Sequence, residues 1–244
     1  MGAPEAPAGH APTAEEAVLF SNRGRFGGTG PPCALAFATP SRIAAACAEV
    51  RRGQRIPCAL PAAPERPPAA TPRLVSAASL TLPVVARGVL LDVARLARRP
   101  WLPDGTEIGP QILDECAELE GVALESGDAV LVRTGYLSGC AGLEAFADYG
   151  SRPAPGLSRR CARWLYERQI ALVGTDTPYV EALRHGAGPR PLREVAVAHT
   201  GVVFGENFHL DALGEACAAD GEYAFVFVCP APVPGAAAAP FAIR

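Results

Sequence analysis

The sequence contains no lysine, so arginine carries every basic charge apart from the histidines. Basic and acidic residues nearly balance, with a formal net charge of −3, and no basic segment is interleaved with aromatic residues. This pattern argues against a nucleic-acid-binding surface. No apolar run approaches the roughly 18 residues that a membrane-spanning helix requires, and the N-terminus does not resemble an export signal. We therefore expect a cytoplasmic protein with neither nucleic-acid nor membrane partners.

The chain has 8 cysteines, but no two of them form a Cys-x-x-Cys motif. Their scattered spacing excludes a zinc ribbon and a small disulfide-bonded scaffold. Several, such as Cys217 and Cys229, have apolar neighbours, so we expect buried, reduced thiols. With 244 residues, of which 49% are hydrophobic, the chain can bury a substantial core as one large domain or two small ones.

Proline and alanine mark the segments that are expected to be irregular. Residues 1–12 are predicted to be a disordered tail. Residues 13–244 are predicted to form a single domain, in which residues 57–72 make a proline- and alanine-rich connection on the surface.

Helices are predicted where capping residues precede a helical apolar pattern. Thr39 is the expected N-cap of a first helix, with Pro40 at its first position, a body over residues 43–50 and Gly53 as its stop. The same signals predict further helices at residues 110–119, 157–168 with Ser158 as the cap, 192–198 and 210–219.

Strands are predicted where short apolar runs lie between these helices. The runs are at residues 88–94, 129–133, 170–173 and 223–228. Strands that alternate with helices predict an α/β (mixed α+β) domain with a central mixed sheet flanked by helices.

A succession of short motifs extends along nearly the whole chain. They include Gly-Val-Leu-Leu-Asp-Val at 88–93, Thr-Gly-Tyr at 134–136, Gly-Thr-Asp-Thr at 174–177 and Gly-Glu-Asn at 205–207. In this order they resemble the cyclase family that includes bacterial kynurenine formamidase and isatin hydrolase. The resemblance implies the cyclase-like swivelling β/β/α fold. It also implies a homo-oligomer, because relatives commonly build their pocket near a subunit interface.

The metal-binding segment of that family has no counterpart here. The family places His-x-Gly-Thr-His-x-Asp ahead of the 88–93 strand, but residues 69–83 of this chain contain no His, Asp, Glu or Cys. Arg193 stands where a further family histidine is expected, and a guanidinium cannot bind a cation. The resemblance therefore implies a divergent member that uses no metal or other cofactor. A weak residual site at His199 and Glu206 stays open as an alternative.

Three residues are the candidate catalytic groups. Glu206 matches the family's metal-binding glutamate and could act as a general acid or base, its pKa raised by the apolar residues 202–204, or it could be a relic paired with Arg193. His199 could be a base, because its pKa lies near neutrality, or it could simply end a helix. Asp176 follows a strand and either faces a pocket or caps the next turn.

Other residues are candidates for substrate binding. Arg193 could bind a substrate carboxylate or an enolate. Arg133, at the end of a predicted strand, could line the pocket or could bond a neighbouring loop. The remaining candidates are Tyr136, whose hydroxyl could orient a carbonyl, Tyr179 and Glu181. Phe26, together with Arg23 and Arg25, could fold over the pocket as an N-terminal arm. His185 is expected in an exposed loop and His209 at the start of a helix.

These observations leave three functional hypotheses. We favour a repurposed, metal-independent enzyme of polyketide-like natural-product biosynthesis that catalyses cyclisation, dehydration or isomerisation, in keeping with a composition typical of a GC-rich bacterial genome. The alternatives are a non-catalytic protein that binds a small molecule or a partner enzyme, and a metal-dependent amide or lactam hydrolase.

Overall fold

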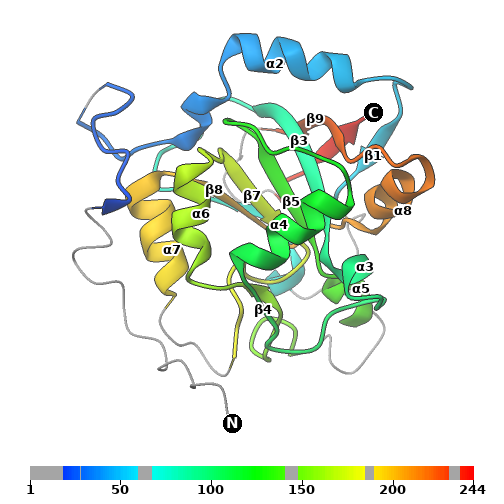
Figure 1. The fold of residues 1–244 in the computed structure, drawn as a ribbon. Helices are drawn as coiled ribbons and strands as arrows, with labels where there is room; N and C mark the ends of the chain where they lie inside the picture. The colour runs from blue at the N-terminus through cyan, green and yellow to red at the C-terminus, as the bar shows by residue number, and fades with distance from the viewer. Residues whose placement is uncertain (1–18, 28, 60–67, 141–147, 185–189, 231–236) are drawn as a thin grey trace.

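The computed structural model describes residues 19–27, 29–59, 68–140, 148–184, 190–230 and 237–244 (Figure 1). In this part of the chain, the main sheet has eight strands in the order β1-β10-β9-β3-β5-β7-β8-β2. Their bounds are β1 Arg55–Pro57, β2 Arg73–Val75, β3 Val84–Asp92, β5 Ala129–Arg133, β7 Leu172–Thr175, β8 Val203–Glu206, β9 Ala224–Cys229 and β10 Phe241–Ile243. Strands β3, β5, β7 and β8 are parallel, and the strands at both margins pair antiparallel.

Helices cover both faces of this sheet. Their bounds are α2 Pro40–Ala46, α3 Val93–Leu96, α4 Pro110–Leu119, α5 Tyr136–Cys140, α6 Cys161–Glu167, α7 Pro191–Val195 and α8 Asp211–Asp220. Short 3₁₀ segments η1, η2 and η3 lie at Ala34–Phe37, Cys47–Glu49 and Pro68–Ala70, and the π-helical turn η5 spans Ala196–Thr200. A separate parallel pair joins β4 (Glu107–Ile108) to β6 (Gly156–Leu157). The predicted mixed α/β architecture is confirmed.

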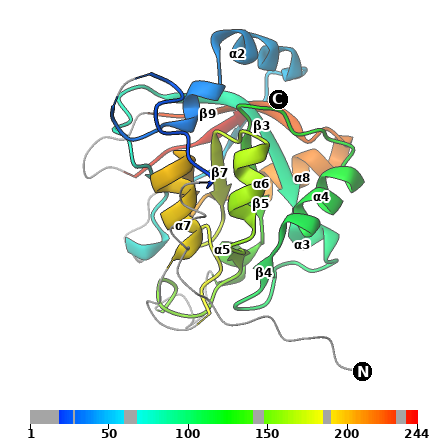
Figure 2. The ribbon, with the colours of Figure 1, turned by 60° about the vertical axis from the view of Figure 1, so that its left-hand side comes forward.

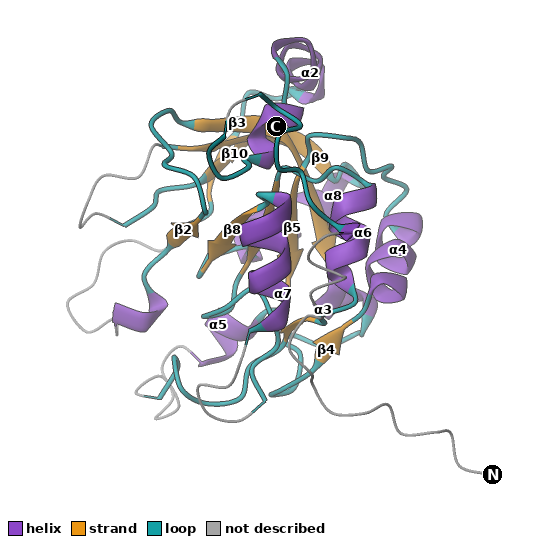
Figure 3. Cartoon of the chain, turned by 90° about the vertical axis from the view of Figure 1, so that its left-hand side faces the viewer, coloured by secondary structure: helices purple, strands orange, loops and turns teal. Residues whose placement is uncertain are grey.

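Alternation along the central strands creates two apolar cores. Val89 and Leu91 of β3 pack with α4, α6 and α7 on one face, whereas Leu90 packs with α8 on the other. Figures 2 and 3 show α6 and α7 lying next to each other along that first face. Because both faces are covered, β5 is buried at every residue, which explains its continuous apolar run.

Several predicted elements match the structure closely. Helix α4 spans the predicted residues 110–119, and β5 spans the predicted 129–133. Thr39 caps α2 by accepting a hydrogen bond from the backbone N–H of Arg42 at 3.4 Å, with Pro40 at the first helical position. This helix ends at Ala46, however, and the chain continues as a 3₁₀ turn, so the predicted body was too long.

Other boundaries were wrong because tertiary contacts decided them. The predicted helix at 157–168 begins only at Cys161, since Leu157 joins β6 and the N–H of Ser158 donates to the carbonyl of Ile108. Ser158 therefore does not cap this helix. Strand β3 ends at Asp92, whose side chain caps α3.

The segments predicted to be irregular lie partly outside the residues that the structure describes. The predicted surface connection at 57–72 contains the end of β1 and all of η3, while its residues 60–67 lie outside the described residues, as do the tail at 1–12 and His185. The edge strands β1 and β2 were not predicted, and neither were β8 and β10 inside the sheet. Within the described residues, no helix is both long and apolar enough to cross a membrane.

Candidate functional site

The carboxyl ends of the parallel strands meet at one edge of the sheet. Asp92 ends β3, Arg133 ends β5, Asp176 directly follows β7, and Glu206 ends β8. In open α/β sheets this edge is the usual location of a binding site. Four of the charged residues that the structure buries therefore come together at the edge where chemistry is expected.

Glu206 forms an ion pair with Arg73 of the edge strand β2. The antiparallel register pairs Arg73 directly with Glu206, and Arg73 Nε donates to Glu206 Oε2 at 2.6 Å. The carboxylate side chain is 1% exposed, whereas the guanidinium side chain is 39% exposed. Of the two alternatives for Glu206, the one that pairs it with Arg193 is thus replaced by a pair with Arg73. The register of β2, which the sequence did not reveal, places a different arginine there.

The guanidinium of Arg73 lies near an aromatic ring that a second guanidinium also contacts. Its Nη2 donates to the carbonyl of Pro178 at 2.8 Å, and its Cζ lies 5.6 Å from the ring centroid of Tyr179. The Cζ of Arg190 lies only 3.3 Å from the same centroid. The negative face of an aromatic ring attracts a cation placed over it, so the ring of Tyr179 helps to hold these guanidinium groups. We call Arg73, Tyr179, Arg190 and Glu206 the Arg73 cluster.

Asn207 fixes the segment that leads into β2. This fully buried residue has φ 62°, in the left-handed region that asparagine tolerates. Its Nδ2 donates to the carbonyls of Ala69 and Thr71, at 2.8 and 2.9 Å, and its Oδ1 accepts from the hydroxyl of Tyr149 at 3.0 Å. The residue after Glu206 thereby holds the strand that carries Arg73.

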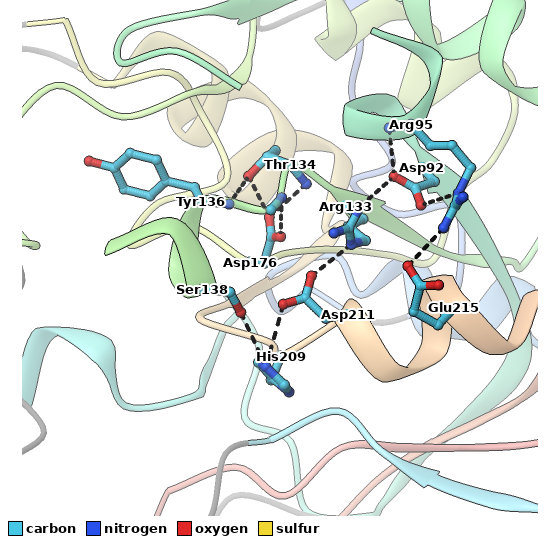
Figure 4. A network of polar contacts seen from close by, with 11 residues as sticks. Asp92, Arg95, Arg133, Thr134, Tyr136, Ser138, Asp176, His209, Asp211 and Glu215 are labelled. Carbon is cyan, nitrogen blue, oxygen red and sulfur yellow. Dashed lines mark hydrogen bonds and ion pairs between the residues drawn. The ribbon is translucent and has the colours of Figure 1, made fainter. Parts of the chain in front are cut away.

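Asp176 organises the turn that follows β5 (Figure 4). Its Oδ1 accepts from the backbone N–H and the hydroxyl of Thr134, at 2.8 and 2.5 Å, and its Oδ2 accepts from the N–H of Gly135 at 2.6 Å. Burial raises the pKa of Asp176 to about 6, although the bonds from Thr134 oppose that rise. Both carboxylate oxygens therefore have partners in the fold.

Arg133 lies between two carboxylates in the same view (Figure 4). Its Nη1 donates to Asp92 Oδ1 at 2.9 Å and its Nε to Asp211 Oδ1 at 2.8 Å. Burial would lower its pKa, but Asp92 and Asp211 outweigh that effect and raise it. Asp92 in turn accepts from Arg95, whose guanidinium also reaches Glu215. The arrangement is a chain of alternating charges from β3 and β5 to α8.

The tyrosine predicted to orient a substrate carbonyl is buried. Tyr136 is 1% exposed, and its hydroxyl donates to the carbonyl of Pro153 at 2.9 Å. Burial raises the pKa of this hydroxyl above its usual value. Its ring lies 5.8 Å from the ring of Tyr149, so Tyr136 connects the Asp176 turn to the partner of Asn207.

Arg193 and Glu181 meet at the start of α7. Glu181 Oε2 accepts from the N–H of Leu192 at 3.1 Å. Burial raises the pKa of Glu181 to about 7, against the opposing effects of the Leu192 bond and the charges of Arg190 and Arg193. Glu181 therefore lies within the electrostatic reach of the Arg73 cluster through Arg190.

His199 and Phe26 lie away from this edge. His199 belongs to the π-helical turn that precedes β8, so the length of β8 separates it from Glu206, and its carbonyl accepts from the N–H of Asn22. Phe26 packs edge-on against Phe37 at 4.9 Å. Phe37 contacts Gly127, just ahead of β5, so the expectation that this arm covers the pocket is not met. His199 and Glu206 are not brought together as a pair.

His209 has a more specific environment than a helix-start residue requires. Its Nε2 lies 3.3 Å from Ser138 Oγ of α5 and 3.7 Å from Asp211 Oδ2 of α8 (Figure 4).

Sequence reasoning also missed Arg73, Tyr149 and Asn207. One signal was available: Arg73 is the only charged residue in the segment 69–83, from which the family's metal ligands are absent.

Comparison with known proteins identifies a family model that matches part of the chain. The family model described as "Putative cyclase" matches residues 66–182, a region that contains Arg73 and Asp176 and ends before Glu206. Over this region, just under half of the chain, the sequence is similar to the cyclase family. No curated protein matches the sequence.

One solved structure supports this cyclase fold, and others are more distantly similar. A crystal structure of "a novel cyclase" has 22% identity and a TM-score of 0.77, covering 92% of this chain and 100% of its own. Isatin hydrolase A from Labrenzia aggregata has 22% identity and a TM-score of 0.46, covering 66% of this chain and 62% of its own. A "predicted metal-dependent hydrolase" from Bacillus stearothermophilus has 16% identity and a TM-score of 0.49, over 78% and 97%. At such identities the first likeness establishes the fold.

The side chains around Glu206 determine whether this chain could hold a metal where the family resemblance places one. Among the residues that the structure describes, no group of three or more His, Cys, Asp or Glu side chains could hold a metal ion. A structural or catalytic zinc usually takes three or four protein ligands. Glu206 already bonds the guanidinium of Arg73. These side chains do not fit a divalent cation at Glu206.

Proposed function

We propose that this cyclase-family chain is a metal-independent enzyme that cyclises, dehydrates or isomerises a small carbonyl compound in polyketide-like natural-product biosynthesis. The observation that carries the proposal is the 2.6 Å ion pair between Arg73 and Glu206. It puts a fixed positive charge beside the carboxylate that resembles the family's metal ligand. We further expect a cytoplasmic homo-oligomer.

In this proposal, Arg73 supplies electrostatic stabilisation. An enolate oxygen that develops during proton abstraction is stabilised by hydrogen-bond donors already aimed at it. Arg73 uses Nε for Glu206 and Nη2 for Pro178, and its side chain is still partly exposed. Since both partners hold the guanidinium in place, little reorganisation is needed when the charge forms.

Glu206 is the proposed proton acceptor. Its Oε2 bonds Arg73, so Oε1 is the atom that takes the proton from the carbon next to the substrate carbonyl. A positioned acid or base typically contributes about 10²–10⁴-fold to a rate. The carboxylate then returns the proton to another substrate atom, which accounts for isomerisation and for the first step of ring closure or dehydration.

Arg190 and Tyr179 are the proposed recognition groups. Arg190 lies over the ring of Tyr179, which the partly exposed guanidinium of Arg73 also contacts. Two neighbouring guanidinium groups favour an anionic ligand, because a substrate carboxylate relieves their mutual repulsion and accepts paired hydrogen bonds. The expected substrate is therefore a carbonyl compound that also bears a carboxylate.

The test measures enolisation directly. Levulinate, a keto acid, is incubated with the protein in D₂O, and deuterium incorporation beside the ketone is followed by NMR. We expect the protein to accelerate exchange, a chelator to have no effect, and Glu206→Gln to slow exchange by roughly 10²-fold or more. Arg73→Lys keeps the charge but removes the planar fork, so an intermediate loss is expected.

Arg163→Ala is the matched control, because Arg163 forms an exposed ion pair with Glu167 within α6. Circular dichroism checks that each variant is folded. Exchange that is equal in the wild type and in folded Glu206→Gln would contradict the acid–base proposal and favour a non-catalytic binding protein. Stoichiometric bound metal with chelator-sensitive exchange would favour the hydrolase-type alternative.

A further inference from the structure

Ser138, His209 and Asp211 converge at the carboxyl edge without sharing a residue with the Arg73 cluster. Ser138 is an exposed residue of α5, and His209 Nε2 lies 3.3 Å from its Oγ. Asp211 Oδ2 lies 3.7 Å from the same nitrogen (Figure 4). We propose that Ser138 and His209 form a second catalytic site, which cleaves activated acyl compounds such as aryl esters through an acyl-serine intermediate.

The histidine is placed to activate the serine. A neutral imidazole with its lone pair on Nε2 accepts the hydroxyl proton of Ser138. Asp211 faces that same nitrogen, so the imidazolium that forms is stabilised by a neighbouring negative charge. Arg133 donates to the other oxygen of Asp211 at 2.8 Å and holds the carboxylate in position. The three residues thus act as a serine–histidine pair with an adjacent acid, rather than as a relay through both ring nitrogens.

An aromatic surface adjoins this pair. Trp101 is 48% exposed, although large aromatic side chains usually are buried. Its ring packs against Gly139, the residue after Ser138: a Cβ added to Gly139 would lie 2.8 Å from Trp101 Cδ2. An aryl group of a substrate can therefore stack beside the serine, which favours aromatic esters.

The surrounding backbone restricts the reaction to activated substrates. The N–H of Leu137 donates to the carbonyl of Asp176, and the N–H of Gly139 donates to the carbonyl of Gly135. These neighbours of Ser138 cannot also stabilise an oxyanion, a contribution worth about 10²–10³-fold per donor. A leaving group of low pKa, such as a phenol, lowers the need for that stabilisation.

The reaction balances without any co-reactant except water. Ser138 Oγ bonds the acyl carbon while its proton moves to His209 Nε2; the bond to the aryloxide then breaks, and His209 returns the proton to the aryloxide. Water next attacks the acyl-serine and gives a proton to His209. The acid departs and Ser138 regains its proton.

The test uses a fluorophosphonate, which loses fluoride when a nucleophilic serine attacks phosphorus, and p-nitrophenyl acetate as the ester. We expect one adduct per chain by intact mass, mapped to Ser138, together with release of nitrophenol. Ser138→Ala should abolish both, and His209→Ala should slow both by roughly 10²-fold or more. Circular dichroism confirms that the variants are folded.

Ser151→Ala is the matched control, since Ser151 is an exposed serine whose Oγ donates to the carbonyl of Asp148 and should be irrelevant. Glu206→Gln should also retain labelling, so this site and the proposed enolisation can fail independently. No adduct on the wild type, equal labelling of Ser138→Ala, or an unchanged rate in folded His209→Ala would each overturn the proposal.

Discussion

Asp176 is a buried carboxylate whose hydrogen bonds define the local backbone. It is 2% exposed and accepts three hydrogen bonds from Thr134 and Gly135. Hydrogen bonds to an ionised acceptor are stronger than neutral ones and offset part of the cost of burial. Asp176 thereby determines where β5 ends and α5 begins, and α5 carries Ser138.

Replacing Asp176 by asparagine should destabilise the protein with little change in volume. An amide NH₂ would face at least one backbone N–H donor, so we expect the free energy of unfolding to fall by about 2–4 kcal/mol. Urea denaturation followed by circular dichroism measures this change. Asp148→Asn, at an exposed position, is the control and should change stability by less than about 0.5 kcal/mol. Equal effects of the two substitutions would refute this role of Asp176.

At the scale of elements, the neighbouring strands β7 and β8 leave room for an aromatic ring through two glycines. Gly174 and Gly205 are register partners in the parallel pair. The ring of Phe208 packs over both: an added Cβ would lie 2.7 Å from the ring at Gly174 and 2.3 Å from it at Gly205. Gly205 directly precedes Glu206, so this packing also sets the position of the proposed catalytic carboxylate.

Gly205→Ala should therefore destabilise the sheet. The new methyl group must displace a buried ring, and overpacking of this kind costs about 1–3 kcal/mol. Reducing the ring with Phe208→Leu in the same chain should recover part of the loss, a coupling that a double-mutant cycle in urea measures. Gly30→Ala is the control, because nothing lies within 4 Å of its added Cβ. Strict additivity of Gly205→Ala and Phe208→Leu would show that the ring is not the obstacle.

For the molecule as a whole, buried carboxyl groups govern the response to pH. Burial raises the pKa of Glu120 and Glu181 to about 7 and of Asp128 and Asp176 to about 6. In the unfolded chain these groups titrate near pH 4. Between about pH 4 and 7 the folded state thus binds more protons than the unfolded state, so the free energy of unfolding falls as pH rises through this window.

We expect the protein to unfold at higher urea concentration at about pH 5 than at about pH 7.5. Glu181→Gln removes one group whose pKa is raised, so it should flatten this dependence by on the order of 1 kcal/mol. Glu167→Gln, in an exposed pair on α6, is the control and should leave the slope unchanged. A urea midpoint that rises steadily from pH 5 to 7.5 would contradict the assignment.

Local sequence was sufficient for the elements whose signals lie within a few residues. Thr39 with Pro40 predicted the start of α2, and the uninterrupted apolar run at 129–133 predicted β5, because capping and burial on both faces leave a direct mark on the sequence. The ordered motifs likewise predicted the cyclase fold. The segment 69–83 showed which ligands were absent, but not what replaced them.

Tertiary structure alone decided which side chains meet. Arg73 is 133 residues from Glu206 and faces it only because β2 adds to the edge of β8 in one register. Ser138 and His209 are 71 residues apart and meet because α5 and the start of α8 both follow the same edge of the sheet. Such contacts depend on strand order and register. No periodicity or spacing along a single chain encodes them, so the arginine beside Glu206 could not be chosen in advance.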